Sequence, residues 1–453
     1  MFEFGRELRR LFGGVRAGPA KDGLCGGDAS LLELLDLEML RGEAKAAEVA
    51  AGRIGARDRP RRMLESAVIW RELARRTGDA VALKRAAASA ARAAEAFDRS
   101  RRPQGWGRAR LEQACCALLG AELFGDEALE TAAERAAEAA RASDGAVGLL
   151  AQQALAQIRG RRAARAGGLT AVRLAARAFN EPIATLEAAG RRQTALKLAA
   201  AEGRIARADM LVCAGLRLKE ETLIRAAIGD LAAVGERLDG AYEPLALARA
   251  QLARAGARGS LAELTGDVAA LVSAVGDLAA ALDRLGREHS PLDWARGQIL
   301  LAQALSQLGE ATEAEAAFDK AIAAYDRAAL VLQGAPGLHL RAEAATGRGV
   351  ALARSAELSG DRGRLDAAEA AFKAELAGGL HHKDPVGWAV LQVQLGQVYA
   401  ARLALSGRDR GERAAAALAF STALDVFGEE GLRSFAAIAA DGLARLGAAQ
   451  VRS

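Results

Sequence analysis

Arginine is the residue type whose number and spacing in this sequence could do chemistry. Residues 146–200 hold nine basic residues against two acidic ones, a net charge of +7, whereas the whole chain carries +5. Clustered guanidinium groups bind phosphates and carboxylates through forked, charge-assisted hydrogen bonds. The arginines of this basic patch are Arg159, Arg161, Arg162, Arg165, Arg173, Arg177, Arg191 and Arg192.

The basic patch predicts an anionic partner: nucleic acid, anionic lipid or an acidic protein. Few aromatic residues are interleaved with the arginines, which disfavours stacking on single-stranded nucleic acid. The alternative interpretation is that the arginines cover the solvent-exposed faces of several helices. The 62 basic residues of the chain are nearly balanced by 57 acidic ones, so the composition does not indicate a global nucleic-acid binder.

Sequence patterns for catalysis or metal binding are missing. The chain has no GxGxxG before a helix, no Walker A motif, no GxSxG, no HExxH and no calcium loop. His381 and His382 are adjacent and cannot share one helix face, so they predict a turn rather than a metal site. The four cysteines lack CxxC spacing, which fits a reducing cytoplasm. We therefore expect a non-catalytic protein with no cofactor and no metal.

The elements that must position the arginines are helices. Ala, Leu, Arg and Glu dominate the chain and favour helices, whereas the aromatic residues that favour strands make up only 4%. Apolar helical stretches alternate with short breaks such as "RTGD", "FGDE" and "LSGD". This punctuation, with no clear domain boundary, predicts an all-α array of repeated helical hairpins.

Tryptophan marks the start of some of these repeats. Three of the four tryptophans follow a proline by three residues, and each opens a long helical stretch. We expect their side chains to pack toward the neighbouring hairpin, and the rival role is an exposed aromatic anchor for a ligand. The three are Trp106, Trp294 and Trp388.

Small and large residues recur at matching places in the C-terminal hairpins. Two helices approach closely only where one offers a small side chain and the other inserts a large one. We expect each small residue of a first helix to lie opposite the phenylalanine of its second helix. The small residues are Ala302, Gly347 and Gly396, and the large ones are Phe318, Phe372 and Phe420.

These residues resemble the tetratricopeptide repeat, whose first helix carries Leu-Gly and then Tyr, as at Leu395, Gly396 and Tyr399, and whose second helix carries Ala…Phe…Ala. The likeness is good over 291–426, fair over 61–142 and weak over 145–290. The repeat period is about 45–50 residues rather than about 34. The resemblance implies a right-handed α-solenoid of about seven or eight tetratricopeptide-like hairpins over 30–453, with a capping helix at about 431–448.

The resemblance also implies a partner groove, because the first helices of this family line a concave surface. Guanidinium and amide groups at the matching positions would form a basic groove for an acidic segment or a C-terminal carboxylate of a partner protein. The alternative is that arginine simply covers these surfaces. The predicted groove residues are Arg296, Gln303, Arg341, Arg348, Val393 and Gln397.

Residues 1–13 predict a short amphipathic helix, followed by a flexible linker over 14–29. Acidic residues interrupt the N-terminus, so it does not read as a signal peptide. The helix could dock on a membrane surface or on a second protein, or it could fold onto the body of the chain. Its apolar residues are Phe2, Phe4, Leu8, Leu11 and Phe12.

Together these patterns predict a bacterial cytoplasmic scaffold or adaptor that binds a segment of a partner protein. The N-terminal helix could also recruit it to the inner face of the membrane. The alternative is a regulator that binds nucleic acid or another anionic partner through the basic stretch 159–197, with nucleic acid the less favoured ligand.

Overall fold

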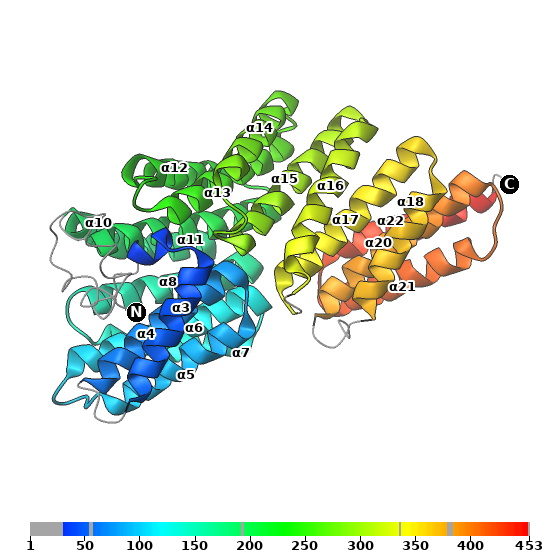
Figure 1. Ribbon diagram of the computed structural model, residues 1–453. Helices are drawn as coiled ribbons and strands as arrows, with labels where there is room; N and C mark the ends of the chain where they lie inside the picture. Colours follow the sequence, from blue (N-terminus) through cyan, green and yellow to red (C-terminus); the bar gives the residue numbers. More distant parts are fainter. Residues whose placement is uncertain (1–29, 54–57, 192–193, 335–336, 378–383, 452–453) are drawn as a thin grey trace. The chain divides into compact units, whose positions relative to one another are not determined.

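A computed structural model describes residues 30–53, 58–191, 194–334, 337–377 and 384–451 (Figure 1). These residues form helices joined by short turns, and no strand occurs among them. The prediction of an all-α fold is confirmed. Several predicted features lie outside the described residues: the helix of residues 1–13 with Phe2, Phe4, Leu8, Leu11 and Phe12, the linker 14–29, Arg192, and the pair His381 and His382.

The chain divides into two compact units, and each is described here by itself. Unit 1 holds the described residues up to Gly297 together with part of Gly334–His339. Unit 2 holds Gln298–Gln333 and the described residues of Leu340–Ser453. The boundary falls within one long helix, α15 (Pro291–Thr312).

Unit 1 begins with a short 3-10 helix and continues as helical hairpins (Figure 1). The first helices of these hairpins are α4, α6, α8, α11 and α13. The elements are η1 (Ser30–Leu34), α3 (Leu37–Gly52), α4 (Arg59–Thr77), α5 (Ala80–Ala96), α6 (Pro103–Phe124), α7 (Glu127–Arg141), α8 (Ala146–Ala166), α9 (Leu169–Ala178), α10 (Asn180–Gly190), α11 (Thr194–Leu218), α12 (Glu221–Arg237), α13 (Pro244–Thr265) and α14 (Val268–Arg284).

A Gly-Asp pair forms the turn of several hairpins. The glycine ends the first helix in the left-handed conformation, which costs glycine little because it has no Cβ. The aspartate then accepts hydrogen bonds from the first backbone amides of the second helix, a cap that contributes about 1 kcal/mol. The pairs are Gly78–Asp79, Gly125–Asp126, Gly266–Asp267 and, in unit 2, Gly360–Asp361.

The region of weakest sequence likeness contains the main irregularity of unit 1. Where other hairpins have one long second helix, α8 is followed by two short helices, α9 and α10. They meet at Phe179, whose side chain is fully buried with Ile183 and Ala156. This buried ring holds the junction in place, and α11 and α12 then resume the regular pattern.

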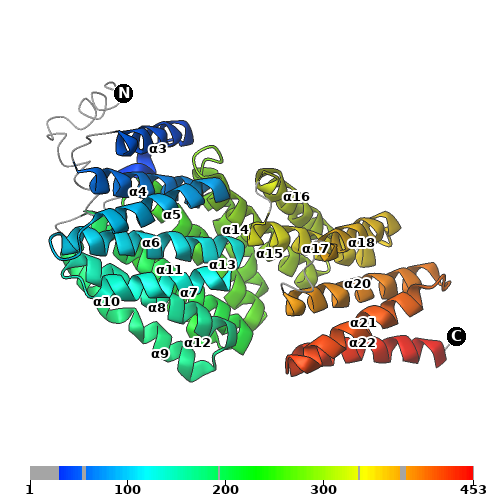
Figure 2. The same cartoon turned by 90° about the horizontal axis from the view of Figure 1, so that it is seen from below.

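Unit 2 continues the hairpins and ends with a single helix. Its elements after α15 are α16 (Glu315–Leu332), α17 (His339–Ser359), α18 (Arg362–Leu376), α20 (Pro385–Ser406), α21 (Glu412–Glu429) and α22 (Arg433–Val451). Helix α21 contacts both α20 and α22, and the three lie side by side in Figure 2. Helix α22 lies where the capping helix is predicted.

Glycine–aromatic contacts join helices in unit 2, as the resemblance to the tetratricopeptide repeat predicts. A Cβ placed on Gly396 would lie 2.9 Å from the ring of Phe420, so only glycine lets the two helices approach this closely. Phe420 is buried in the packing of α20, α21 and α22. The prediction of tetratricopeptide-like helical hairpins is confirmed, and this glycine lies where the pattern places it.

The register of the preceding hairpin differs from the prediction. Phe372 lies against Gly349, where a Cβ would come within 2.6 Å of its ring, rather than against Gly347. Gly347 instead faces Tyr325 of the previous hairpin. Residues 347 and 349 point to nearly opposite sides of α17 because two residues turn an α-helix by about 200°. Phe318 lies against Gly309, whereas the sequence pattern predicts Ala302 at this contact.

The three repeated tryptophans are half-buried. Trp106 packs against a cluster that includes Met63 and Phe97, and Trp388 packs against the core of α20, α21 and α22. Trp294 lies with the guanidinium of Arg287 5.9 Å from its ring centre. Each of the three side chains is therefore partly accessible to solvent.

Candidate functional site

Helix α4 brings a buried acid and two arginines together near its C-terminal end. Arg76 is fully buried and donates hydrogen bonds to Glu72 at 2.7 Å and to the backbone oxygens of Leu35, at 2.6 Å, and Leu32. A buried charge is tolerated only when it is paired and hydrogen-bonded. Arg76 therefore fastens the η1 segment to α4.

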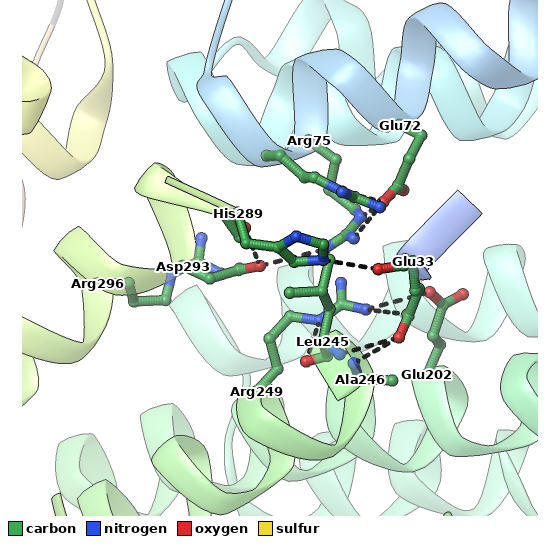
Figure 3. A network of polar contacts seen from close by, with 12 residues as sticks. Glu33, Glu72, Arg75, Glu202, Leu245, Ala246, Arg249, His289, Asp293 and Arg296 are labelled. Carbon is green, nitrogen blue, oxygen red and sulfur yellow. Dashed lines mark hydrogen bonds and ion pairs between the residues drawn. The ribbon is translucent and has the colours of Figure 1, made fainter. Parts of the chain in front are cut away.

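Arg75 extends this network to the start of α15. It forms two hydrogen bonds with Glu72, at 2.6 and 2.8 Å, and an ion pair of 3.4 Å with Asp293 (Figure 3). Burial alone would raise the pKa of Glu72, but Arg75 and Arg76 hold it well below its usual value. Asp293 also accepts the hydroxyl hydrogen bond of Ser290 at 2.7 Å, and its pKa is lowered by nearby arginines against the effect of burial.

Glu33 joins the first described element of unit 1 to α13. One oxygen of its carboxylate accepts the backbone amides of Leu245 and Ala246 at 3.0 and 3.1 Å, and the other lies 3.3 Å from Arg249 (Figure 3). His289 donates to the backbone oxygen of Glu33 at 2.7 Å. Burial raises the pKa of Glu33, while Arg249 opposes the shift. A carboxylate at the N-terminus of a helix is favoured by the helix dipole.

Arg296 is the predicted groove residue that lies in unit 1, and it is already paired. Its guanidinium contacts Glu122 of α6 at 3.0 Å. Burial favours the neutral form of the guanidine, but the carboxylates of Glu122, Asp293 and Asp209 raise the pKa of Arg296. Arg296 is 41% exposed, so an acidic partner would have to compete with Glu122 for its guanidinium.

Asp209 on α11 is exposed to solvent and forms no ion pair with any residue that the structure describes. Burial by the surrounding protein nevertheless raises the pKa of Asp209 to about 6, with Arg296 opposing the shift and Glu122 adding to it.

A second accessible acid, Glu202, lies two turns earlier on the same helix. Its side chain is 49% exposed and lies 3.7 Å from Arg249. We name the charged side chains around Asp209 the first-helix cluster, because its members come from first helices of successive hairpins. They are Glu122, Arg161, Glu202, Asp209, Arg249 and Arg296.

The arginines of the first-helix cluster are occupied, whereas its acids are in part available. Arg249 pairs with Glu33, Arg296 with Glu122, and Arg161 with Glu130. Asp209 and Glu202 can therefore accept hydrogen bonds from an incoming cation or amide. The cluster can bind donors and can exchange a proton near pH 6 at Asp209.

The predicted groove residues of unit 2 fall into three groups. Gln303 donates to Glu343 at 2.8 Å, and Arg348 pairs with Asp326 at 2.6 Å, so both already have partners. Val393 is 5% exposed and packs in the core beside Phe420, so its prediction as a groove residue is wrong. Arg341 and Gln397 are exposed.

The first half of the basic patch is paired with acidic residues of the preceding helix, which reduces its charge. Arg161, Arg162 and Arg165 lie within 3.4 Å of Glu130 on α7, and Arg162 also pairs with Glu134 at 2.8 Å. Arg159 lies 3.6 Å from Glu138 of the same helix. The net charge of a sequence window therefore overstates the charge of this surface, because the compensating acids precede residue 146.

The second half of the basic patch has no such pairing with acidic residues. Arg173, Arg177 and Arg191 are exposed, and no ion pair involves them among the residues that the structure describes. Arg173 and Arg177 line a pocket between α9, α10, α11 and α12.

The described part of the chain shows neither a metal-binding cluster nor a membrane-spanning helix. No group of three or more His, Cys, Asp or Glu side chains there has a geometry that could hold a metal ion. Nor does any described helix combine the length and apolar character needed to cross a bilayer.

The sequence patterns did not identify the acids of this site. Glu33 and Glu72 are buried, and Asp209 and Glu202 lie on a first helix rich in alanine and arginine. The signal that could have identified them is the presence of acidic residues within the otherwise apolar first helices. On the second helices, acidic residues are expected on the outer, solvent-exposed face.

Comparisons with known proteins show likeness in architecture at low identity. No protein-family model matches the chain, and no curated protein does. A Rap protein complexed with competence and sporulation factor is 11% identical, with 90% of this chain and 99% of that chain covered and a TM-score of 0.46. A signal-transduction ATPase with a tetratricopeptide repeat sensor from Pyrococcus horikoshii is 14% identical, with 84% and 55% covered and a TM-score of 0.48.

Yeast Tom70 is also 14% identical, with 91% of this chain and 96% of that chain covered and a TM-score of 0.26. At these identities and TM-scores the likenesses carry no argument about what the chain binds.

Proposed function

We propose that this chain is a non-catalytic scaffold that binds a segment of a partner protein at the first-helix cluster of unit 1. Helical-hairpin repeats place one helix of each pair beside the next, so their first helices form a continuous surface suited to an extended segment. The segment would contribute a lysine, an arginine or backbone amides to the accessible acids.

The observation that carries this proposal is Asp209. Its carboxylate is exposed and forms no ion pair among the described residues, although Arg249 and Arg296 on neighbouring helices are both paired elsewhere. A carboxylate whose pKa is raised by burial gains when a cation replaces the lost water. This favours a basic segment over the acidic one predicted from the sequence.

A peptide-library selection tests the proposal. Peptides of random sequence are selected on the full chain at pH 7.5, and their affinities are then compared between the wild type and the double variant Asp209→Asn with Glu202→Gln. We expect selected peptides to contain basic residues and to bind the double variant at least about tenfold more weakly, the loss of about 1.4 kcal/mol. The matched control is Asp283→Asn with Glu236→Gln, two exposed acids on α14 and α12.

Two results would contradict the proposal. Either the wild type selects no peptide above background, or the selected peptides bind wild type and double variant equally. Loss of binding in the control as well would point to a general charge effect and would also count against the site.

Membrane recruitment is a separate proposal about residues 1–13. Three phenylalanines within the first twelve residues of an aromatic-poor chain support it. Flotation with anionic liposomes that is lost on deleting residues 1–13 would support recruitment, and equal flotation of both chains, or none, would contradict it.

A further inference from the structure

A pocket of about 370 Å³ opens between α9, α10, α11 and α12, where the second helix of a hairpin is split in two. Its lining includes Arg173 and Arg177 of α9 and Arg207 of α11. Leu211 and Leu223 contribute apolar surface. This volume is within the range of pockets that hold small ligands.

The acid in the pocket is already matched by two arginines. Asp230 lies 2.7 Å from the Nε of Arg207 and 2.9 Å from the Nη1 of Arg204. Arg207 also donates to the side-chain oxygen of Asn180 at 2.7 Å, which holds the guanidinium in one orientation. The charges of Arg173 and Arg177 are therefore in excess at this pocket.

The beginning of α12 adds to the positive potential. Thr222 and Leu223 of its first turn line the pocket, and the N-terminus of a helix carries a partial positive charge. Two acids flank this helix start. Glu221 pairs with Arg225 at 2.8 Å, whereas Glu220 accepts the hydroxyl hydrogen bond of Thr222 at 2.6 Å and keeps a negative charge that offsets part of this potential.

We propose that this pocket binds a small organic anion, with a carboxylate or phosphate group between Arg173 and Arg177 and an apolar portion against Leu211 and Leu223. Two adjacent arginines bind either oxyanion through forked hydrogen bonds. The split of the second helix into α9 and α10 makes room for the ligand. The site uses none of the residues of the first-helix cluster. A negative result for anion binding would therefore not contradict the proposed scaffold function, and failure of the scaffold proposal would not contradict this site.

Calorimetric titration of the full chain tests the site with three probes of similar size. Phenyl phosphate and benzoate carry the two oxyanions, and benzyl alcohol is the neutral analogue. We expect at least one anion to bind with a Kd below about 1 mM, and benzyl alcohol to bind at least tenfold more weakly. The stronger of the two anions identifies the oxyanion that the pocket prefers.

Two variants distinguish anion binding in the pocket from a general effect of positive charge. Arg173→Gln with Arg177→Gln should weaken anion binding at least about tenfold. Ala226→Met, a substitution at an exposed pocket residue, should fill the pocket and abolish binding without a change in charge. Their controls are Arg284→Gln and Ala171→Met, at exposed positions outside the lining, which should bind as the wild type does.

Three outcomes would overturn the proposal. The wild type could bind neither anion, it could bind the neutral analogue as tightly as the anions, or the pocket variants could bind as well as their controls. Circular dichroism melting of each variant shows that any loss of binding is not a loss of folding.

Discussion

Unit 1 and unit 2 use the same helical hairpins but hold them together differently. In unit 1, polar contacts join residues far apart in the sequence: Glu33 and Leu245 are separated by 212 residues, and Arg75 and Asp293 by 218. In unit 2, ion pairs such as Arg354–Glu310 and Arg364–Asp319 span 44 and 45 residues, about one hairpin.

The two kinds of contact have different consequences for the cooperativity of unfolding. Contacts between neighbouring hairpins add stability locally, as in a one-dimensional array. Contacts between the beginning and the end of unit 1 make its hairpins depend on one another. The long-range contacts of unit 1 are also buried, whereas those named for unit 2 are largely exposed, so removing one partner costs more in unit 1.

The largest expected effect is that of Glu72→Ala in unit 1. It leaves Arg76 buried without its carboxylate and should lower the free energy of unfolding by about 3–5 kcal/mol. Glu310→Ala, which removes the exposed partner of Arg354 in unit 2, should cost less than about 1 kcal/mol. Urea denaturation followed by circular dichroism measures both, and equal losses would remove the contrast between the units.

A smaller effect is expected from Gly349→Ala in unit 2. The added methyl group would lie 2.6 Å from the ring of Phe372, so the two helices must move apart at a cost of about 1–3 kcal/mol. The control is Gly447→Ala in α22, where nothing lies within 4 Å and a gain of roughly 0.5–1 kcal/mol is expected. Thermal melting compares them, and a stabilised Gly349→Ala protein would show that the contact is not tight.

Glu33→Gln tests the long-range closure of unit 1. The neutral amide loses the charge that faces Arg249 and the start of α13, and the expected loss is about 1–2 kcal/mol. Hydrogen exchange should accelerate at the amides of Leu245 and Ala246, far away in the sequence. Glu38→Gln, at an exposed position of α3, is the control. Unchanged exchange at Leu245 and Ala246 would show that Glu33 does not close the unit.

The smallest effect is the pH dependence of Asp209. Its folded pKa of about 6 lies above the unfolded value, so the folded chain binds the extra proton between about pH 4 and 6. Stability contributed by that proton is therefore lost as pH rises through 6. Glu122, Arg161, Arg249 and Arg296 face the group.

Asp209→Asn should reduce the fall in melting temperature between pH 4.5 and 7 relative to the wild type. Asp283→Asn, an exposed acid of α14, should leave it unchanged. A wild-type profile identical to that of Asp209→Asn would contradict the assignment. The same proton should oppose a basic partner segment, so partner affinity should rise above pH 6.

Local sequence patterns were sufficient for the all-α hairpins and for the contact of Gly396 with Phe420. They failed for Gly347, because whether a small residue faces its own hairpin or the previous one depends on a rotation of the helix that packing decides. They also failed for Glu33 and Arg75, whose partners lie more than 200 residues away. The charge of 159–165 was misjudged because its partners precede the window.

The bond from Glu33 to the start of α13 limits how unit 1 can change in length. An array with contacts between neighbours alone tolerates the duplication or loss of a hairpin, since every remaining hairpin keeps its neighbours. In unit 1 an added or deleted hairpin between α4 and α13 would carry Leu245 and Ala246 away from Glu33. The contact of Glu33 with α13 therefore forms only when the number of hairpins between them is unchanged. We expect unit 1 to accept point substitutions more readily than the gain or loss of a whole hairpin.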